Sequence, residues 1–480
     1  MKTKWSEMIK VALNMILSVC LFALSWAALT PYFRLGRKAD GDHFRNLPAD
    51  TIEALAIGSS HMQYAFNPGT YYAYTGRNAY VYGSVCQPFD ASYWILKEAF
   101  AYQSPAVVYV DIYTLLPQSE NCYADEVYYV AGDLLSKENR DAMFKEAVGL
   151  DAKTRWMYRF DLYMNHDYWK EMDYKTLREA RLPFSGYDES LGYVRQEPKA
   201  FRYTPLPILE VQEKVILTDQ EKQEIKRIIT LCKAHHAHLV FTCAPYLMDQ
   251  ASTDKKEAIW IYLQQQHIPY LDEIKASKDH WFLDMHGDTA HNNSWGAEIV
   301  TRDYALFAMD NAYFGKHPDD PIINRLVRDV EEANAVSLLS RNNINVYTLL
   351  EAAQHYPCRL AIRFKGNRKH GLGAYEAASL QKAGVSVDLS KEYRGDYYAL
   401  IQNGEVVQES DGPFSVVLQE HTYQFTETDI LIDEKSIEEK GEMQLVFMPE
   451  DGRWINPIGI DYASKWFWKN GCDGWQCDDE

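Results

Sequence analysis

Cysteine is scarce in this chain, and its eight copies show no pattern that would build a disulfide framework or a zinc site. Between the N-terminal segment and the tail the cysteines lie without repeated spacing, at Cys86, Cys122, Cys232, Cys243 and Cys358. There is neither a CxxC pair nor a spaced His/Cys set, so no metal is predicted, and no motif predicts a cofactor. Cys472 and Cys477, in GCDGWQC, are close enough for a local disulfide, and two free thiols are the open alternative.

Basic residues are also few, because 49 Lys and Arg face 68 Asp and Glu, for a formal net charge of −19. Such a surface repels phosphate backbones, which argues against a nucleic-acid partner. No repeat or low-complexity tract is evident, and a hydrophobic content of 47% predicts a globular chain rather than a disordered one. At 480 residues the chain exceeds one ordinary core, so two or more folding units are expected.

A long apolar run does occur, near the N-terminus. Val11–Leu29 is uncharged, follows Lys2, Lys4 and Lys10, and has about the 20 residues that a bilayer-spanning helix requires. The end of this run and the residues after it, SWAALTPYF (Ser25–Phe33), offer a poor cleavage site, so an uncleaved anchor is predicted and a cleaved signal peptide is the alternative. The bulk of the chain is expected to be extracytoplasmic at the cell membrane, with a cytosol-facing enzyme as the weaker alternative. The predicted order of cytoplasmic tail, transmembrane anchor and stalk covers residues 1–10, 11–30 and 31–49.

After residue 50, short apolar runs alternate with amphipathic helical stretches, which predicts a parallel sheet with helices on both faces. Strands are predicted at residues 51–60, Ala79–Tyr82, Ala106–Tyr113, Ala237–Tyr246 and Ile268–Glu273. Helices are predicted between them at Ala91–Tyr102, Asp219–His235 and Thr253–Gln266. The expected three-layer α/β/α domain covers 50–315. An aromatic, charged stretch at about 122–207 is interpreted as a helical insertion, either a lid over a site or a packed excursion.

The string HPDDP (His317–Pro321) marks a change of unit, and a second, smaller α/β domain is expected at 316–480. Its patterns include a strand at Cys358–Phe364 and a helix at Ala374–Ala383. Tyr397–Ser410 reads as a hairpin with Asn403-Gly404 at its turn.

The first strand ends in Gly58-Ser59-Ser60-His61, which places hydroxyls at the carboxyl edge of the sheet, where such folds carry their chemistry. Serine is a weak nucleophile until a histidine takes its proton, and that histidine needs a carboxylate to fix its tautomer. His61 is a poor base for Ser60, because consecutive side chains at a strand end diverge. It is interpreted as a site-lining or structural residue rather than a base.

A better base lies far downstream, in LDMHGDTAHNNSWGAE (Leu283–Glu298). Asp288 and His291 are three residues apart there, in a loop before a helix that starts near Trp295. One loop can therefore present both groups, with Asp288 on one ring nitrogen of His291 and the other nitrogen free for a serine.

The combination of these motifs resembles the SGNH (GDSL-type) hydrolases over about residues 50–310. It is similar to their membrane-anchored, extracytoplasmic branch, which includes the D-alanyl-lipoteichoic-acid biosynthesis protein DltD and the alginate O-acetyltransferases. The resemblance implies that Ser60 is the nucleophile, His291 the base and Asp288 the acid. It also implies that the backbone N–H groups of Ser60 and Gly83 form an oxyanion hole.

One position departs from the family pattern. An asparagine donor should follow the strand Ala106–Val110, but Asp111 stands there, and a carboxylate repels an oxyanion. Either the side chain of Asn67 or Gln87 substitutes, or the site is not that of a conventional hydrolase. Gly83, Ser59, His61, Asn67, Gln87 and Asp111 are thus the predicted oxyanion or site-lining residues.

The C-terminal part weakly resembles bacterial versions of the interleukin-like EMT inducer (ILEI) domain, which implies binding of ligands or partners. Together the resemblances imply an extracytoplasmic serine esterase or O-acyltransferase that modifies a cell-envelope polysaccharide or teichoic-acid-like polymer. A membrane-bound O-acyltransferase is the implied partner. The alternative is a non-catalytic surface-assembly or carbohydrate-binding protein with a degenerate hydrolase fold, for which Asp111 is the main support.

Overall fold

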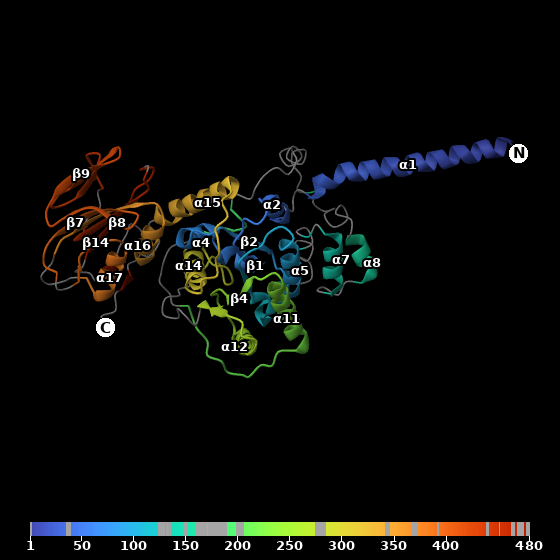
Figure 1. Ribbon diagram of the computed structural model, residues 1–480, viewed down its shortest axis with the longest axis horizontal. Coiled ribbons are helices and arrows are strands. Elements are labelled where there is room, and N and C mark those ends of the chain that lie inside the picture. Colours follow the sequence, from blue (N-terminus) through green and yellow to red (C-terminus); the bar gives the residue numbers. More distant parts are fainter. Residues whose placement is uncertain are drawn as a thin grey trace.

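The chain forms an α/β body, a C-terminal region of antiparallel sheets and one long N-terminal helix (Figure 1). The fold class predicted from the sequence is therefore confirmed. The computed structural model describes residues 2–34, 40–122, 130, 134, 136–146, 151–158, 170, 190–197, 206–273, 285–340, 346–366, 372–390, 393–437, 441–450, 452–461, 466–467 and 475–476. Cys472, Cys477 and most of the predicted insertion at 122–207 lie outside these residues.

Five parallel strands form the sheet of the body, in the order β2-β1-β3-β4-β5. Their bounds are Ala54–Ser59 for β1, Ala79–Ser84 for β2, Val107–Asp111 for β3, His238–Cys243 for β4 and Tyr270–Asp272 for β5. The chain adds β2 on one side of β1 and the remaining strands on the other. Such a reversal marks the carboxyl ends of β1 and β3 as the place where ligands bind in open α/β sheets.

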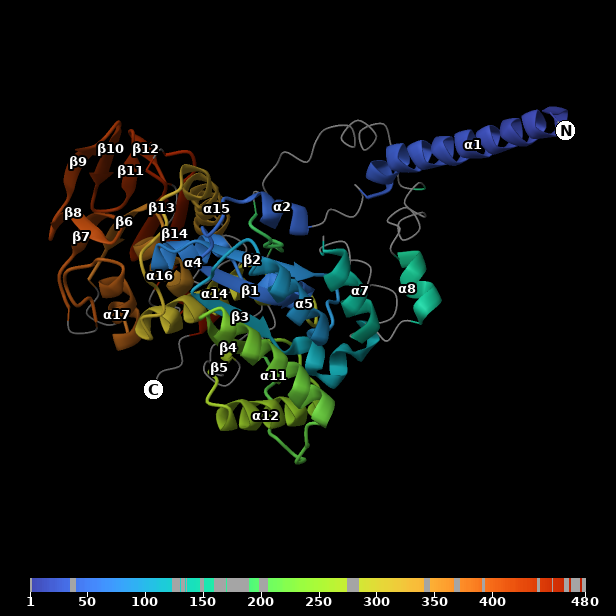
Figure 2. The same cartoon turned by 45° about the vertical axis from the view of Figure 1, so that its right-hand side comes forward.

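The alternating side chains of β1 face two separate cores. Leu55 and Ile57 pack in a core with helices α5 (Phe89–Ala99), α11 (Asp219–Ala234) and α12 (Gln250–Gln265). Ala54 and Ala56 pack in the opposite core, with α3 (Ser60–Ala65), α4 (Pro68–Thr75) and α14 (Ser294–Asp310). Figure 2 shows the sheet between these two helical layers. The three-layer arrangement follows from this two-sided burial.

Shorter elements surround the body. Helix α2 (Asp40–Asn46) lies within the predicted stalk, and its Phe44 is buried against Tyr80 and Tyr82 of β2. The others are η1 (Tyr113–Leu115), η2 (Pro117–Cys122), α7 (Lys137–Glu146) and α8 (Ala152–Tyr158).

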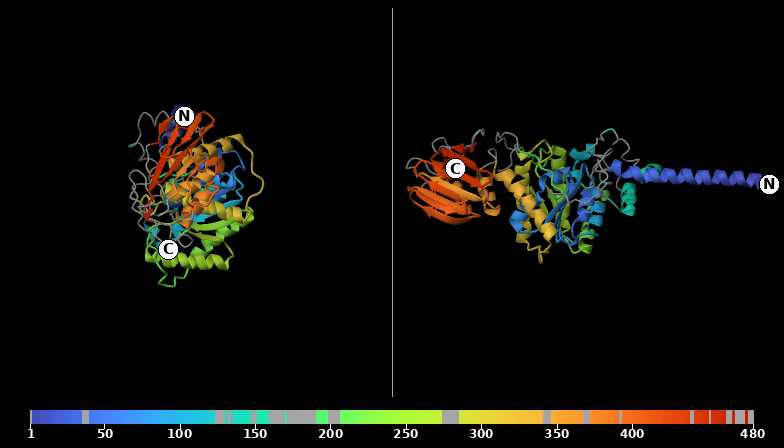
Figure 3. Two further views of the ribbon diagram at one scale, coloured as in Figure 1. Left: turned by 90° about the vertical axis from the view of Figure 1, so that its left-hand side faces the viewer. Right: turned by 90° about the horizontal axis from the view of Figure 1, so that it is seen from above.

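Helix α1 (Lys2–Arg34) projects away from the body as a single helix (Figures 1 and 3). Its stretch Met8–Leu29 has 22 residues and a mean hydropathy of 2.0, and none of its most apolar window is buried against the rest of the chain. That is long and apolar enough to cross a bilayer, which is compatible with the predicted single-pass anchor.

The C-terminal region packs two antiparallel sheets face to face and covers the outer face of the larger one with helices. Ala361, Leu400 and Val446 of the larger sheet meet Tyr423 and Ile430 of the smaller one. Helices α16 (Val346–His355) and α17 (Ala374–Lys382) share a core with the other face. The larger sheet has the order β16-β15-β14-β13-β6-β7-β8, and the smaller has β12-β11-β10-β9. Their strands are β6 (Arg359–Phe364), β7 (Tyr397–Gln402), β8 (Glu405–Ser410), β9 (Phe414–Leu418), β10 (His421–Phe425), β11 (Ile430–Ile432), β12 (Lys435–Ser436), β13 (Met443–Met448), β14 (Asn456–Asp461), β15 (Trp466–Phe467) and β16 (Trp475–Gln476).

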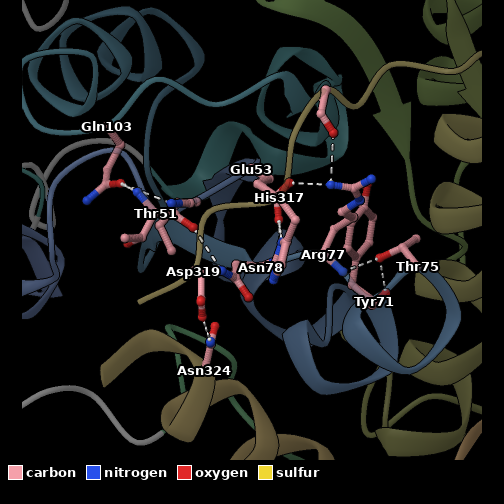
Figure 4. Close-up of polar contacts among 12 residues, drawn as sticks. Thr51, Glu53, Tyr71, Thr75, Arg77, Asn78, Gln103, His317, Asp319 and Asn324 are labelled. Carbon is pink, nitrogen blue, oxygen red and sulfur yellow. Dashed lines mark hydrogen bonds and ion pairs between the residues drawn. The ribbon is translucent and has the colours of Figure 1, made fainter. Parts of the chain in front are cut away.

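The connection that leads out of the body is fastened to the amino end of its sheet (Figure 4). Glu53, just before β1, accepts hydrogen bonds from Arg77 Nη1 at 2.9 Å and from the backbone N–H of Asn78 at 3.1 Å. His317, from the HPDDP string, places Nδ1 2.6 Å from Glu53 Oε2. Arg77 also donates to the carbonyl oxygen of Gly315 at 3.1 Å. The connection is thus held at two points before the next helix begins.

That next helix, α15 (Pro321–Leu339), joins the body to the C-terminal region through a buried polar cluster. At its centre Glu298 of α14 is fully buried, and its Oε2 accepts from Thr70 Oγ1 at 2.5 Å, Tyr356 OH at 3.0 Å and Asn334 Nδ2 at 3.2 Å. Its Oε1 has no hydrogen-bond partner among the described residues. Burial therefore raises the pKa of Glu298 to about 7, although these three hydrogen bonds act to lower it.

We expect Glu298→Gln to flatten the pH dependence of stability. The ordinary pKa of a glutamate is 4.5, and the pKa of Glu298 in the folded protein is about 7. Between these two pH values the folded protein keeps a proton on Glu298 that the unfolded chain releases. The stabilisation is complete below pH 4.5 and is lost as the pH rises through 7, by about 3 kcal/mol in total. Other carboxyls with a raised pKa, such as Asp90, contribute equally to the pH dependence of the wild type and of Glu298→Gln. Denaturant unfolding of the two proteins between pH 4.5 and 8 measures the difference, and parallel curves would contradict the assignment.

Candidate active site

Ser60 opens helix α3, directly after β1, and a glycine makes this turn possible. A Cβ at position 58 would lie 2.9 Å from both Asp111 Cβ and Met62 Cβ, so only glycine lets β3 and α3 approach β1 this closely. Ser59 is buried and caps α3, because its Oγ accepts the backbone N–H of His61 at 3.3 Å. Ser60, in contrast, is only half-buried. Of the two serines, only Ser60 is accessible, and Ser59 is a helix cap rather than a site-lining group.

The structure brings together the three residues predicted to form the triad. Ser60 Oγ lies 2.9 Å from His291 Nε2, although 231 residues separate them in the chain. His291 Nδ1 lies 2.8 Å from Asp288 Oδ2. Asp288 Oδ1 accepts the backbone N–H groups of Ala290 and His291 at 2.8 and 2.9 Å, so the loop holds its own carboxylate in place.

The protonation of this chain of hydrogen bonds follows from Asp288. Burial raises its pKa, but the hydrogen bonds from the His291 side chain and from two backbone N–H groups outweigh burial and leave the pKa below its ordinary value. An ionised Asp288 accepts from Nδ1–H, so Nε2 carries the lone pair that can receive the Ser60 proton. The side chains of His291 and Asp288 are 24% and 51% exposed, which leaves the arrangement open to a large substrate.

A short segment of the predicted insertion, Ser190–Glu197, forms backbone hydrogen bonds with β2, with α3 and with the residues that follow His291. Leu191 O accepts the N–H of Val81 in β2 at 2.9 Å, and Val194 N–H donates to Gln63 O of α3 at 2.9 Å. Gln196 O accepts the N–H of Ser294, three residues after His291, at 2.7 Å. The serine helix and the histidine loop therefore rest on the same piece of backbone.

Asp111 is not left facing an oxyanion, because it is paired with His61. Asp111 Oδ2 lies 2.9 Å from His61 Nδ1, and Asp111 Oδ1 accepts the backbone N–H of Tyr113 at 3.2 Å. The two side chains are 2% and 0% exposed. The buried imidazole does not line the accessible surface, which favours the structural interpretation of His61 over the site-lining one.

The two amides proposed to replace the missing asparagine donor are engaged elsewhere. Asn67 is fully buried and caps α4, where its Oδ1 accepts from Gly69 N at 2.9 Å while its Nδ2 donates to Asn334 at 2.6 Å. Gln87 is fully buried as well, and its Nε2 donates to Ser92 Oγ at 2.8 Å. Neither amide is exposed in this structure, and the substitution of either one for the missing donor stays a prediction.

Gly83 lies where the sequence placed it, at the end of β2 and in register with Gly58. A Cβ at position 83 would lie 2.5 Å from the Gly58 carbonyl oxygen, so a side chain here would push β2 away from β1. The Gly83 carbonyl accepts from Gln63 Nε2 at 2.9 Å. That its N–H serves an oxyanion stays a prediction.

Two contacts of the site have no clear sequence signal. The ring of Tyr64 packs on His291 with centroids 4.6 Å apart, and it is one helical turn from Ser60. The pairing of His61 with Asp111 depends on β1 and β3 being neighbours, which spacing along the chain does not indicate. Within the described part of the chain, no group of three or more His, Cys, Asp or Glu side chains could hold a metal ion.

Comparisons with known proteins add little to this geometry. No protein-family model matches the chain, and no curated protein matches its sequence. Among solved structures, it is similar to a Bacteroides fragilis protein that is provisionally described as an acylhydrolase, at 12% identity and a TM-score of 0.28. The match covers 54% of this chain and 88% of that one. A similarity of this size assigns no family.

Proposed function

We propose that the protein is a membrane-anchored serine esterase or O-acyltransferase that acts on a polymer of the cell envelope. The observation that carries this proposal is the continuous chain of hydrogen bonds from Ser60 Oγ through His291 to Asp288, with distances of 2.9 and 2.8 Å. Nucleophile, base and orienting acid in mutual hydrogen-bond reach are what acyl transfer through a serine requires.

In the proposed reaction, Ser60 Oγ attacks the acyl carbonyl of the donor while His291 Nε2 takes the hydroxyl proton. The backbone N–H groups of Ser60 and Gly83 stabilise the oxyanion, and each such donor is typically worth about 3 kcal/mol. His291 then returns the proton to the departing alcohol, which leaves an acyl ester on Ser60. A second hydroxyl attacks this ester with His291 again as base. Water as the acceptor releases a free acid, and a sugar hydroxyl receives the acyl group.

The N-terminal helix α1 and the C-terminal sheets support the outer surface of the membrane as the place where the protein acts. The apolar stretch of α1 would hold the site close to the outer surface of the membrane, within reach of a membrane-bound O-acyltransferase that supplies acyl groups. The C-terminal sheets are proposed as a binding module for the polymer, in line with the ILEI-like sequence pattern. The open exposure of His291 and Asp288 suits a polymer better than a small enclosed substrate.

A non-catalytic binding protein was the alternative at the sequence level, with the charge of Asp111 as its support. Both carboxylate oxygens of Asp111 already accept a hydrogen bond, one from His61 and one from the Tyr113 backbone. These contacts support the enzyme proposal, because Asp111 is not a free carboxylate beside Ser60.

We expect a fluorophosphonate probe to label the full-length protein at Ser60, because the probe phosphonylates serines that a histidine activates. Ser60→Ala should abolish labelling. Ser59→Ala is the matched control: it should still be labelled at Ser60, although more slowly, because the buried Ser59 caps α3. Intact-protein mass spectrometry with peptide mapping provides the measurement. No labelling of the wild type, or labelling that persists in Ser60→Ala, would contradict the enzyme proposal.

A further inference from the structure

The residue next to the proposed nucleophile is half of a buried, hydrogen-bonded pair that the acyl-transfer mechanism does not use. We propose that His61 is a positioning residue. Held by Asp111, it fixes the first turn of α3 and thereby sets the place of Ser60 relative to His291. This inference rests on the proposed function and adds to it a residue that touches neither substrate nor the reacting atoms.

Stability alone does not account for this pair. His61 and Asp111 are 0% and 2% exposed, so both polar groups lose their hydration, which the hydrogen bond between them only partly offsets. An apolar pair of the same shape would hold the core about as well. A pair retained at the carboxyl ends of β1 and β3 is better explained by geometry, because a hydrogen-bonded pair fixes one orientation where apolar packing allows several.

The imidazole is held from three directions by residues that come from other parts of the sheet. Asp111 at the end of β3 binds Nδ1 at 2.9 Å. Tyr113 of η1 stacks on one ring face, with centroids 4.4 Å apart and an interplanar angle of 12°. Tyr246, after β4, meets the ring edge-on at 5.3 Å. The ring of His61 therefore ties α3 to the segments that follow β3 and β4.

Helix α3 needs such an anchor because it is only six residues long, and isolated helices of this length do not hold themselves together in water. Ser60 is its first residue and His61 its second. His291, in contrast, arrives on a loop before α14. The 2.9 Å contact between Ser60 and His291 therefore depends on where α3 is held, and a displacement of about 1 Å in such a contact can cost about 100-fold in rate.

His61 does not compete with His291 for the role of base. Its Nε2 is buried and has no hydrogen-bond partner among the described residues, so a substrate in the open site does not reach it. Ser60 Oγ is already engaged by His291. The effect of His61 on the reaction must therefore pass through the backbone of α3.

The test compares fluorophosphonate labelling kinetics of full-length variants, with the maximal labelling rate kinact separated from the probe affinity KI. His61→Leu should lower kinact by about 100-fold with KI little changed. His61→Asn should restore most of the rate, because its amide N–H occupies the place of Nδ1–H and can still donate to Asp111. Where His61→Leu fails to fold, as judged by circular dichroism, Asp111→Asn carries the test with its volume unchanged, and it should also lower kinact.

His317→Leu is the matched control, because it removes a histidine–carboxylate pair of the same kind at the opposite end of β1. It should destabilise the fold and leave kinact unchanged. The inference is overturned if His61→Leu labels at the wild-type rate, or if His317→Leu loses as much kinact as His61→Leu. Failure of the wild type to label would overturn the proposed function and the inference together, so the two failures are distinguishable.

Discussion

His291→Ala is expected to lower the turnover of a p-nitrophenyl acetate substrate by about 10⁵- to 10⁶-fold, with little change in KM. Without Nε2 at 2.9 Å, Ser60 must attack as an unassisted hydroxyl, and water must attack the acyl ester on Ser60 without a general base. The oxyanion donors and the fold remain, so a small residual rate over water should persist.

The double variant Ser60→Ala/His291→Ala gives this expectation its sharpest form. Residues that act as one unit lose their joint contribution when either is removed, so the double variant should be no slower than the slower single variant. Losses that multiply would mean that the two side chains act independently. A single His291→Ala variant that keeps more than about a tenth of the activity would show that another group serves as base.

Asp288→Asn is expected to lower kcat by about 10³- to 10⁴-fold while leaving the loop in place. An asparagine can keep its Oδ1 on the backbone N–H groups of Ala290 and His291, which now bind Asp288 Oδ1. Its Nδ2, however, would donate to Nδ1 of His291, where the carboxylate accepts. The imidazole would then carry its proton on Nε2 and could no longer take one from Ser60.

The C-terminal region offers a matched control for Asp288→Asn. His421 Nδ1 lies 2.8 Å from Asp433 Oδ2, and Asp433 Oδ1 accepts a backbone N–H from Thr422. Asp433→Asn makes the same chemical change in the same kind of pair, but in the smaller sheet of the C-terminal region instead of beside Ser60, and should leave kcat unchanged. Steady-state kinetics of the three proteins between pH 5 and 9 provide the measurement. Wild-type kcat in Asp288→Asn would remove Asp288 from the mechanism.

Much of the body could be predicted from local pattern. Each predicted strand of the parallel sheet overlaps an observed one, because buried strands between amphipathic helices leave a strong apolar signal. The hairpin turn at Asn403-Gly404 was also evident, and both residues have the positive φ that such a turn requires. The proximity of Ser60, Asp288 and His291 was expected from the chemistry that serine needs rather than from periodicity.

The features that could not be predicted from the sequence depend on contacts between segments that are far apart in the chain. Helix α3 is too short to show an apolar period, and it forms because Ser59 caps it and β3 supports it. The four-stranded sheet that contains Tyr423 is built from short, half-exposed strands. The partner of Asp111 could not be predicted, because a family position predicts the residue that should stand there and says nothing of the neighbour that a different residue acquires.

The long reach of the contacts around the site has a consequence for how the protein is made. Ser60 meets a partner 231 residues later, and Thr70, on the helix that follows α3, meets Tyr356, which comes 286 residues later. At about 5–20 residues per second, synthesis of the 231 residues that separate Ser60 from His291 takes about 12–46 s. Throughout this time the serine is present without its base. Ser60 of the nascent chain therefore cannot yet react with acyl donors. We expect it to become reactive only after His291 has been synthesised and has folded against it.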